Sequence, residues 1–591
     1  MIRVADYVAE FIYNSGVKHI FLVTGGGAMH LNDGIAAHKK IKYVCCHHEQ
    51  TVSMAIESYS RITENLGVGC VTSGPGGTNT VTGIVSAWQD SIPCMIISGQ
   101  SKRKETIAHS KLDGLRQFGS LEVNIVDIVK SITKYSVMVM DPKMIRYHLE
   151  KAVYLAKSGR PGPVWIDVPL DVQGAMIDQN TLKKFTPPEK KQPDISKSLK
   201  ELIKLLKNAK KPVVIAGSGI RSAKAIPQFL SFIEKTNIPT VNTFMSLDII
   251  ENDHSLYIGR LGTKGNRAAN FAVQNADLLI AIGTSLKVTV IGYEYDLFAP
   301  KAKKVAIDID PIEHKKPTIK IDLFIESDAK YFLEELYKEC KDENITSPDL
   351  WKTVCSNWKN KYPPVLVSQE SDEIDMYYFV DRLSNHTKKE DIIICDAGYP
   401  FYVVAQALRL KEGQRYITPG SLGTMGYNLP AAIGASTADK SKRVICITGD
   451  GSLQMNIQEL QTIVHNSIPV KIFVLNNCGY VSIKEAQLRY FGRVIGAGKD
   501  TGISFPELSK IANAYGIKYI TVSNPSELDT VIKSTLGYDE PVICDVKTTQ
   551  NQKISPIVTS EIRPDGSMVS KPLDDMYPFL DRKTYFNETN V

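Results

Sequence analysis

A carboxylate and a carboxamide stand directly after two apolar runs that lie close together in the chain. The sequence GDGS at 449–452 follows the run 444–447, and NNCGY at 476–480 follows the run 470–475. Both runs are typical of buried parallel strands, and the periodic stretch 456–466 between them predicts a helix. The oxygens of Asp450 and Asn477 suit Mg²⁺, whose octahedral coordination is completed by phosphate oxygens and water. The spacing therefore predicts a site for Mg²⁺ and a diphosphate, which Gly449 and Gly451 let the backbone approach closely.

Three further segments carry candidate chemical groups. Glu49 follows a strand-like run and opens a helix, and the glycine-rich sequence TSGPGGTN at 72–79 follows another such run. Met425 lies in a third glycine-containing segment, GTMGYNLPAA at 423–432. Each has an ordinary structural interpretation: a first-turn charge that suits the helix dipole, a tight turn, and a core methionine. Their combination with the GDG and NN segments favours a functional role.

The bulk properties exclude several classes of protein. Hydrophobic content of 43% and charged content of 23% are ordinary for a globular chain, and 591 residues predict about three or four domains. A net charge of +6 without a basic tract gives no support for a nucleic-acid partner. The start of the chain has no signal-peptide pattern and no apolar run could span a bilayer, so no membrane association is expected. The ten cysteines lack CxxC spacing, which indicates reduced thiols and a cytoplasmic protein.

Strand-like runs alternate with helical patterns along the chain. This alternation predicts an α/β protein with three doubly wound, parallel-sheet domains. A Lys- and Pro-rich stretch near 186–193 predicts a linker, and the polar sequence 340–364 predicts a second separation. The expected boundaries are 1–172, 193–340 and 370–550, followed by a C-terminal tail at 551–591. The predicted strands are 20–23, 43–46, 68–71, 94–97, 164–167, 212–216, 278–282, 304–308, 444–447 and 470–475.

The combined segments resemble thiamine diphosphate (ThDP) enzymes, and most closely the acetohydroxyacid (acetolactate) synthases. The resemblance runs to about residue 550 and implies, in order, a pyrimidine-binding domain, a central FAD-binding-like domain and a diphosphate-binding domain. Those enzymes decarboxylate pyruvate and transfer the two-carbon unit to a second 2-keto acid. They carry FAD and build each active site from two subunits, which implies a homodimer or homotetramer. The matching stretches are HEQ 48–50, SGPG 73–76, SGQ 98–100, GRPGPV 159–164, LGT 261–263, FAPKA 298–302, DIDP 308–311 and the GDG and NN segments.

The resemblance also implies a role for individual residues. Glu49 would hydrogen-bond N1′ of the aminopyrimidine and so promote proton transfer from the thiazolium ring. Met425 would be the apolar wedge between the two cofactor rings. Asp450, Asn477 and the Gly479 carbonyl would hold Mg²⁺. The other expected ThDP-binding residues are Gly26, Asn79, Gln100, Tyr399, Gly423, Gly449, Gly451, Ser452 and Tyr480; the expected FAD-binding residues are Arg160, Gly217, Gly262, Thr263 and Asp308.

The chain departs from the family pattern where the acceptor substrate would bind. Thr289 stands where the family has an arginine, and a threonine cannot replace the bidentate contact of a guanidinium with a carboxylate. Ala486 stands where the family has a tryptophan, which would open volume. These changes predict an acceptor larger than pyruvate that lacks a carboxylate at that place, such as a keto-sugar nucleotide. The other departures at the expected acceptor pocket are Ser120, Leu121, Leu170 and Lys264.

The sequence thus predicts a ThDP-dependent carboligase that decarboxylates a 2-keto acid donor, with pyruvate expected, and transfers the two-carbon unit to a carbonyl acceptor. The alternatives are an acetolactate synthase of branched-chain amino-acid biosynthesis, a 2-keto acid decarboxylase, and a sulfoacetaldehyde acetyltransferase-like enzyme. A cofactor-binding regulator without catalysis is a further alternative, which the intact Glu49, Asp450 and Asn477 disfavour.

Overall fold

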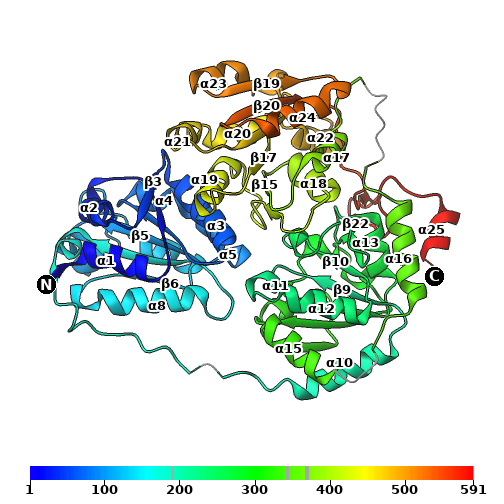
Figure 1. Ribbon diagram of the computed structural model, residues 1–591, viewed down its shortest axis with the longest axis horizontal. Helices are drawn as coiled ribbons and strands as arrows, with labels where there is room; N and C mark the ends of the chain where they lie inside the picture. The colour runs from blue at the N-terminus through cyan, green and yellow to red at the C-terminus, as the bar shows by residue number, and fades with distance from the viewer. Residues whose placement is uncertain (190, 341–344, 366–371, 590–591) are drawn as a thin grey trace.

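Three α/β lobes make up the chain, as a computed structural model shows for residues 1–189, 191–340, 345–365 and 372–589 (Figure 1). Each lobe is built on one six-stranded parallel sheet with helices packed against it. The prediction of three doubly wound domains is therefore confirmed. No helix in the described ranges combines the length and the apolar character that crossing a bilayer requires.

The three sheets have the same general layout: the first strands of each lobe run to one edge of the sheet, and the later strands are added on the other side of the first strand. The first, in the order β3-β2-β4-β5-β7-β6, contains β2 His19–Leu22, β3 Lys42–Cys45, β4 Gly67–Val71, β5 Cys94–Gln100, β6 Tyr135–Met138 and β7 Val164–Pro169. The second, in the order β11-β10-β9-β12-β13-β14, contains β9 Pro212–Ala216, β10 Thr240–Asn242, β11 Tyr257–Arg260, β12 Leu278–Ile282, β13 Lys303–Asp308 and β14 Leu323–Glu326. The third, in the order β16-β15-β17-β18-β20-β19, contains β15 Ile392–Cys395, β16 Arg415–Ile417, β17 Val444–Gly449, β18 Lys471–Asn476, β19 Lys518–Val522 and β20 Val542–Lys547.

The third sheet brings the predicted metal-binding segments to one edge. Strands β17 and β18 are parallel neighbours, with Gly449 opposite Leu475, and β15 lies on the other side of β17. The residues that follow these three strands therefore meet at the carboxyl edge of the sheet, where open α/β sheets bind ligands. The helix predicted at 456–466 is shorter than expected, because a 3₁₀ turn at Gln454–Asn456 precedes helix α21, Glu459–His465.

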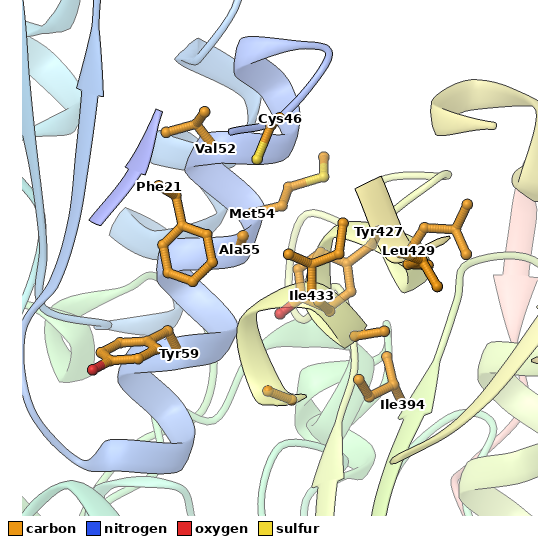
Figure 2. Close-up of a cluster of buried hydrophobic side chains, with 14 of the residues drawn as sticks. Phe21, Cys46, Val52, Met54, Ala55, Tyr59, Ile394, Tyr427, Leu429 and Ile433 are labelled. Carbon is orange, nitrogen blue, oxygen red and sulfur yellow. The ribbon is translucent and has the colours of Figure 1, made fainter. Parts of the chain in front are cut away.

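The first and third domains pack together through helix α3, Glu49–Thr63, and helix α19, Asn428–Ala438 (Figure 2). Both helices carry small residues at the contact, so their backbones approach closely. A Cβ atom at Gly434 would lie 2.2 Å from the Ala55 carbonyl oxygen, and Ser58 Oγ donates to the Ala431 carbonyl at 2.8 Å. This contact fixes the start of α3, which is Glu49, relative to the segment that precedes α19.

The C-terminal tail covers the central domain. Asn270 on helix α13, Arg267–Gln274, donates to the Leu573 carbonyl, and Arg267 donates to the Pro578 carbonyl at 2.6 Å. Glu588 on helix α25, Arg582–Thr589, accepts from the Trp358 indole on helix α16, Asp349–Lys361. The sequence 340–364, interpreted as a separator, therefore contains a helix that belongs to the central domain. Residues 190, 341–344, 366–371 and 590–591 of the predicted linkers and tail lie outside the described residues.

The close approach of α3 and α19 predicts a stability effect. We expect Gly434→Ala to lower the melting temperature by several degrees, because the added methyl group meets backbone atoms and such overpacking costs about 1–3 kcal/mol. The matched control is Gly537→Ala at the end of α24, Leu528–Gly537, where a Cβ atom would have no neighbour within 4 Å. Equal melting temperatures for the two variants would contradict the proposed importance of this contact.

Candidate active site

Asp450 and Asn477 present two unsatisfied oxygens at the carboxyl edge of the third sheet. Asp450 opens the short helix α20, Asp450–Leu453, and is 4% exposed, while Asn477 follows β18 and is 7% exposed. Neither Asp450 Oδ2 nor Asn477 Oδ1 has a hydrogen-bond partner among the described residues. Since buried polar atoms are normally paired, two such oxygens from neighbouring strands fit a cation ligand set.

The electrostatic environment of Asp450 agrees with a cation site. Burial raises the pKa of Asp450 to about 6, although the backbone N–H groups of Gly451, Cys478 and Gly479 oppose the shift. A bound cation would favour the ionised carboxylate. No group of three or more His, Cys, Asp or Glu side chains suited to a metal occurs in the described part of the chain. A metal here would thus rely on one carboxylate, a carboxamide and backbone carbonyls, as predicted for Asp450, Asn477 and Gly479.

The glycines of this edge stand where side chains would not fit. A Cβ atom at Gly451 would lie 2.2 Å from the ring of Tyr480, and one at Gly479 would lie 2.4 Å from the Ala497 carbonyl oxygen. The Tyr480 N–H donates to the same Ala497 carbonyl at 2.8 Å. Ser452 is buried beside them. The loop around the predicted cation site is therefore held in a single, tightly packed arrangement.

Glu49 opens α3 and is half-buried. Its Oε2 accepts a hydrogen bond of 3.0 Å from Asn79 Nδ2, so the glycine-rich loop of the first domain orients the carboxyl group. The backbone N–H groups of His47 and His48 donate to Glu459 of the third domain at 3.1 and 3.0 Å. The third domain therefore fixes the approach to Glu49.

The segment that carries Met425 is tied to all three domains. Asn456 Nδ2 bridges the Gly426 carbonyl at 2.8 Å and the side chain of Gln50, which follows Glu49, at 3.0 Å. At the other end, the Ser421 N–H donates to Asp90 of the first domain at 3.1 Å, and Lys287 of the central domain donates to the Ser421 hydroxyl. Met425 itself is half-buried.

The remaining predicted ThDP-binding residues occupy different environments. Gly26 and Gly423 are exposed, and the hydroxyl of buried Tyr399 donates to Glu485. Gln100 is buried, and its amide nitrogen already donates to Asp167 Oδ2 at 3.0 Å and to a backbone carbonyl. The Gln100 side chain therefore supports the end of β5 from within the first domain.

Three family models match the three domains in order. They are the N-terminal TPP binding domain, the central domain and the C-terminal TPP binding domain of thiamine pyrophosphate enzymes, at residues 2–119, 199–336 and 396–546. The acetolactate synthase large subunit of Cyanidium caldarium is 34% identical over 562 residues, which is 92% of this chain and 93% of the relative. The chain belongs to the acetolactate synthase-like thiamine pyrophosphate enzymes.

Other relatives of this acetolactate synthase-like enzyme have comparable coverage. The large subunit of Porphyra purpurea acetolactate synthase is 33% identical and covers 93% of this chain and 92% of the relative. Isozyme 2 of Escherichia coli strain K12 is 30% identical and covers 97% of this chain and 99% of the relative. Because thiamine pyrophosphate is another name for ThDP, the prediction of a ThDP-dependent enzyme is confirmed.

A cavity of about 200 Å³ lies at the carboxyl end of the central sheet, and residues of the first domain and Ser421 of the third domain also line it. Arg160 and Asp308 line it, as predicted for an FAD site, whereas Gly217, Gly262 and Thr263 do not. Arg160 already pairs with Asp310 at 3.0 Å and with Glu313 at 2.6 Å. The cavity is smaller than the roughly 300–1,000 Å³ of typical ligand pockets. FAD therefore remains a prediction for this enzyme.

The residues predicted to form the acceptor pocket fall into separate groups. Ser120 and Leu121, with Leu121 64% exposed, lie beside the glycine-rich loop of the first domain, where a Cβ atom at Gly74 would meet the Leu121 carbonyl. Thr289 on α14, Val288–Ile291, is adjacent to Lys264, because its carbonyl accepts from the N–H of Thr263 at 3.0 Å. Leu170 begins α9, Leu170–Gln173, and Ala486 is exposed on α22, Val481–Phe491.

Sequence reasoning missed several polar residues that hold this site together. Asn456 and Glu459 follow GDGSLQ directly and are both buried, yet only their hydrogen bonds reveal the role. Asp90 is the last residue of the amphipathic helix α5, Val81–Asp90. A polar residue inside an otherwise apolar, buried segment was the available signal in each case.

The anchoring of the Met425 segment predicts a role for Asp90. We expect Asp90→Ala to weaken ThDP binding by about tenfold, because the Ser421 N–H loses an ionised acceptor. Titration of the apoenzyme with ThDP at constant Mg²⁺, followed by thermal shift, measures the affinity. Asp539→Ala is the control, since Asp539 is exposed on the turn before β20. Equal ThDP affinities of Asp90→Ala and Asp539→Ala would show that the Met425 segment does not need the hydrogen bond to Asp90.

Proposed function

We propose that this enzyme is a 2-keto acid carboligase of the acetolactate synthase type, with pyruvate as donor and a second 2-keto acid as acceptor. The observation that carries the proposal is the pair of unpartnered buried oxygens, Asp450 Oδ2 and Asn477 Oδ1, in a chain that matches acetolactate synthase large subunits over nearly its full length. The keto-sugar nucleotide expected from Thr289 has no counterpart in the names of these relatives. A 2-keto acid is therefore the preferred acceptor.

The described residues can perform the protein's part of this reaction. Bound ThDP supplies the carbon nucleophile and the electron sink for decarboxylation. Glu49 holds a proton at N1′ of the aminopyrimidine, and Asn79 keeps the Glu49 carboxyl group in place through their 3.0 Å hydrogen bond. Asp450, Asn477 and the Gly479 carbonyl would hold Mg²⁺, which would supply positive charge for binding the diphosphate. Met425 lies in the segment anchored by Asn456 and provides the apolar support for the cofactor rings.

Magnesium and FAD are parts of the same proposal. The unpartnered oxygens of Asp450 and Asn477 support Mg²⁺, and removal of divalent cations with a chelator should abolish ThDP binding until Mg²⁺ is restored. Arg160 and Asp308 support a flavin, which the visible absorbance of the purified enzyme tests directly. A colourless enzyme with full activity would reject FAD without affecting the rest of the proposal.

We also propose that the enzyme is at least a homodimer, as homodimer or homotetramer. Large apolar side chains are exposed close to the predicted site, and extended apolar surface usually marks an interface. They include Met29 after β2, Tyr43 on β3, Met455 in the diphosphate-binding segment, and Leu488 and Phe491 on α22. Light scattering of the enzyme in the presence of ThDP and Mg²⁺ tests this, and a monomeric active species would contradict it.

The reaction itself is tested by supplying the enzyme with pyruvate, ThDP and Mg²⁺ and identifying the products by mass spectrometry. We expect acetolactate from pyruvate alone. Glu49→Gln should lower pyruvate consumption by about 100-fold or more, because general acid–base contributions are typically about 10²–10⁴-fold. Glu507→Gln, an exposed residue before α23, Leu508–Ala514, is the matched control. Unchanged activity of Glu49→Gln would reject the mechanism, and products from keto-sugar nucleotides alone would reject the 2-keto acid acceptor.

A further inference from the structure

Arg260, the last residue of β11, is a buried cation without a counter-ion. It is only 4% exposed, yet no hydrogen bond or ion pair of its guanidinium occurs within the described residues, and its Nε has no partner at all. Its titratable neighbours are phenol groups, among them Tyr402 and Tyr416, and burial lowers the pKa of Arg260. An unpaired buried charge is costly unless a ligand or another group compensates for it.

Lys264 is a second cation in the same place. Its Nζ lies 3.4 Å from the centre of the Tyr402 ring and has no hydrogen bond or ion pair in the part of the chain that is described. Burial, followed by the positive charge of Arg260, lowers the pKa of Lys264 to about 8. The nearest carboxylate, Glu485, accepts from the Tyr399 hydroxyl and from Arg489 at 3.0 Å. The two cations therefore share one region that has an excess of positive charge.

Arg267, the other buried arginine among the described residues, donates to the backbone carbonyls of Met576 and Pro578, and three less buried arginines are ion-paired. Arg61 contacts Glu57 at 2.5 Å and Asp90 at 3.0 Å, Arg415 contacts Asp248 at 2.9 Å, and Arg443 contacts Asp391 at 2.6 Å. Arg260 is the most buried of these arginines, and its guanidinium has no hydrogen-bond acceptor among the described residues. The difference indicates a local requirement for positive charge.

The cation pair lies next to the predicted active site. Tyr402 and Tyr399 are both on helix α18, Tyr399–Ala407, which starts at the carboxyl end of β15. At the start of this helix, the ring of Pro400 lies 4.0 Å from the Cβ position of Gly449, in the diphosphate-binding loop. Glu485, which faces Lys264, is on α22, directly after the Asn477–Tyr480 segment. The cations thus neighbour two helices that border the diphosphate- and metal-binding segments, and they are separate from Asp450 and Asn477.

We propose that Arg260 and Lys264 bind the acidic group of the acceptor substrate, a carboxylate or a phosphate. This inference rests on the proposed carboligase function and gives its acceptor a recognition site. A donor 2-keto acid loses its carboxylate as CO₂, whereas the acceptor keeps its acidic group throughout the reaction. A fixed pair of cations suits the group that persists, and cationic side chains form strong charge-assisted hydrogen bonds with either anion.

The first experiment compares acceptors with and without an acidic group. With pyruvate as donor, the pairs are 2-oxobutanoate against propanal, and dihydroxyacetone phosphate against dihydroxyacetone. For Lys264→Met we expect the ratio of kcat/KM for the charged acceptor to that for its uncharged partner to fall by about tenfold or more. Lys264→Arg should restore most of the ratio. Lys510→Met, an exposed residue of α23, is the control and should keep the wild-type ratio.

The two acceptor pairs separate the two sources of the anion. A loss confined to the 2-oxobutanoate pair identifies a carboxylate, and a loss confined to the dihydroxyacetone phosphate pair identifies a phosphate. If Lys264→Met and Lys510→Met give the same ratios in both pairs, the proposal is wrong. The melting temperature of each variant distinguishes a specific effect from misfolding.

The second experiment does not depend on turnover. Acetic anhydride labels neutral amines, so peptide mass spectrometry of the ThDP- and Mg²⁺-loaded enzyme gives the labelling of Lys264 across pH. Its charged and titratable neighbours are Arg260 on β11, Tyr402 on α18 and Glu485 on α22. Labelling should rise through about pH 8, and oxamate or inorganic phosphate should shift this rise to higher pH, because a bound anion favours the protonated amine.

Acetamide is the uncharged control for oxamate. Lack of protection by both anions would overturn the proposal, even in an active enzyme. Conversely, absence of pyruvate consumption with protection intact would reject the proposed reaction and retain an anion site. The anion-site proposal and the proposed carboligase reaction can therefore be rejected separately.

Discussion

The backbone contact between α3 and α19 is the constraint on which the rest of the structure depends. A helix pair can approach this closely only when small residues face each other, as Ala55 and Gly434 do. The contact joins the domain that carries Glu49 to the domain that carries Asp450. Because the two domains are locked together, hydrogen bonds such as those from Glu459 can set the positions of single loops. The packing of α3 against α19 therefore fixes the two domains, and hydrogen bonds then position the polar residues of the predicted active site.

Charge pairing distinguishes structural from functional positions in this enzyme. Buried charges that hold domains together are compensated, and the Asp248–Arg415 pair between the central and third domains is one case. Several buried polar atoms have no hydrogen-bond partner among the described residues, and two of these places suit ligands of opposite charge. At Asp450 and Asn477 the unpartnered atoms are oxygens, which suit a cation. At Arg260 the unpartnered atom is a nitrogen, which suits an anion. Uncompensated burial is costly, so ligands are its simplest explanation.

Much of the fold could be predicted from the sequence, because strands buried on both faces leave a continuous apolar pattern. The runs 212–216 and 278–282 coincide with β9 and β12, and the order of domains follows from the GDG, NN and HEQ segments. Short strands such as β16, only three residues long, leave no such pattern. The same limit applies to the site: the partners of Asn456 and the missing partner of Arg260 are tertiary properties. Thr289 suggested a lost anion contact and Lys264 was expected in the acceptor pocket, but the grouping of Lys264 with Arg260 and Tyr402 became visible only in three dimensions.

The location of Arg260 and Lys264 bears on how the enzyme distinguishes its donor from its acceptor substrate. A cation held against the donor carboxylate would stabilise the substrate more than the transition state, in which that charge is leaving as CO₂, and would slow decarboxylation. An acceptor has the same charge before and after bond formation, so a cation can bind it without this penalty. Placing Arg260 and Lys264 on the α18 side, apart from Asp450, meets both requirements. Recognition of acceptor charge can then vary between relatives while the cofactor-binding residues stay the same.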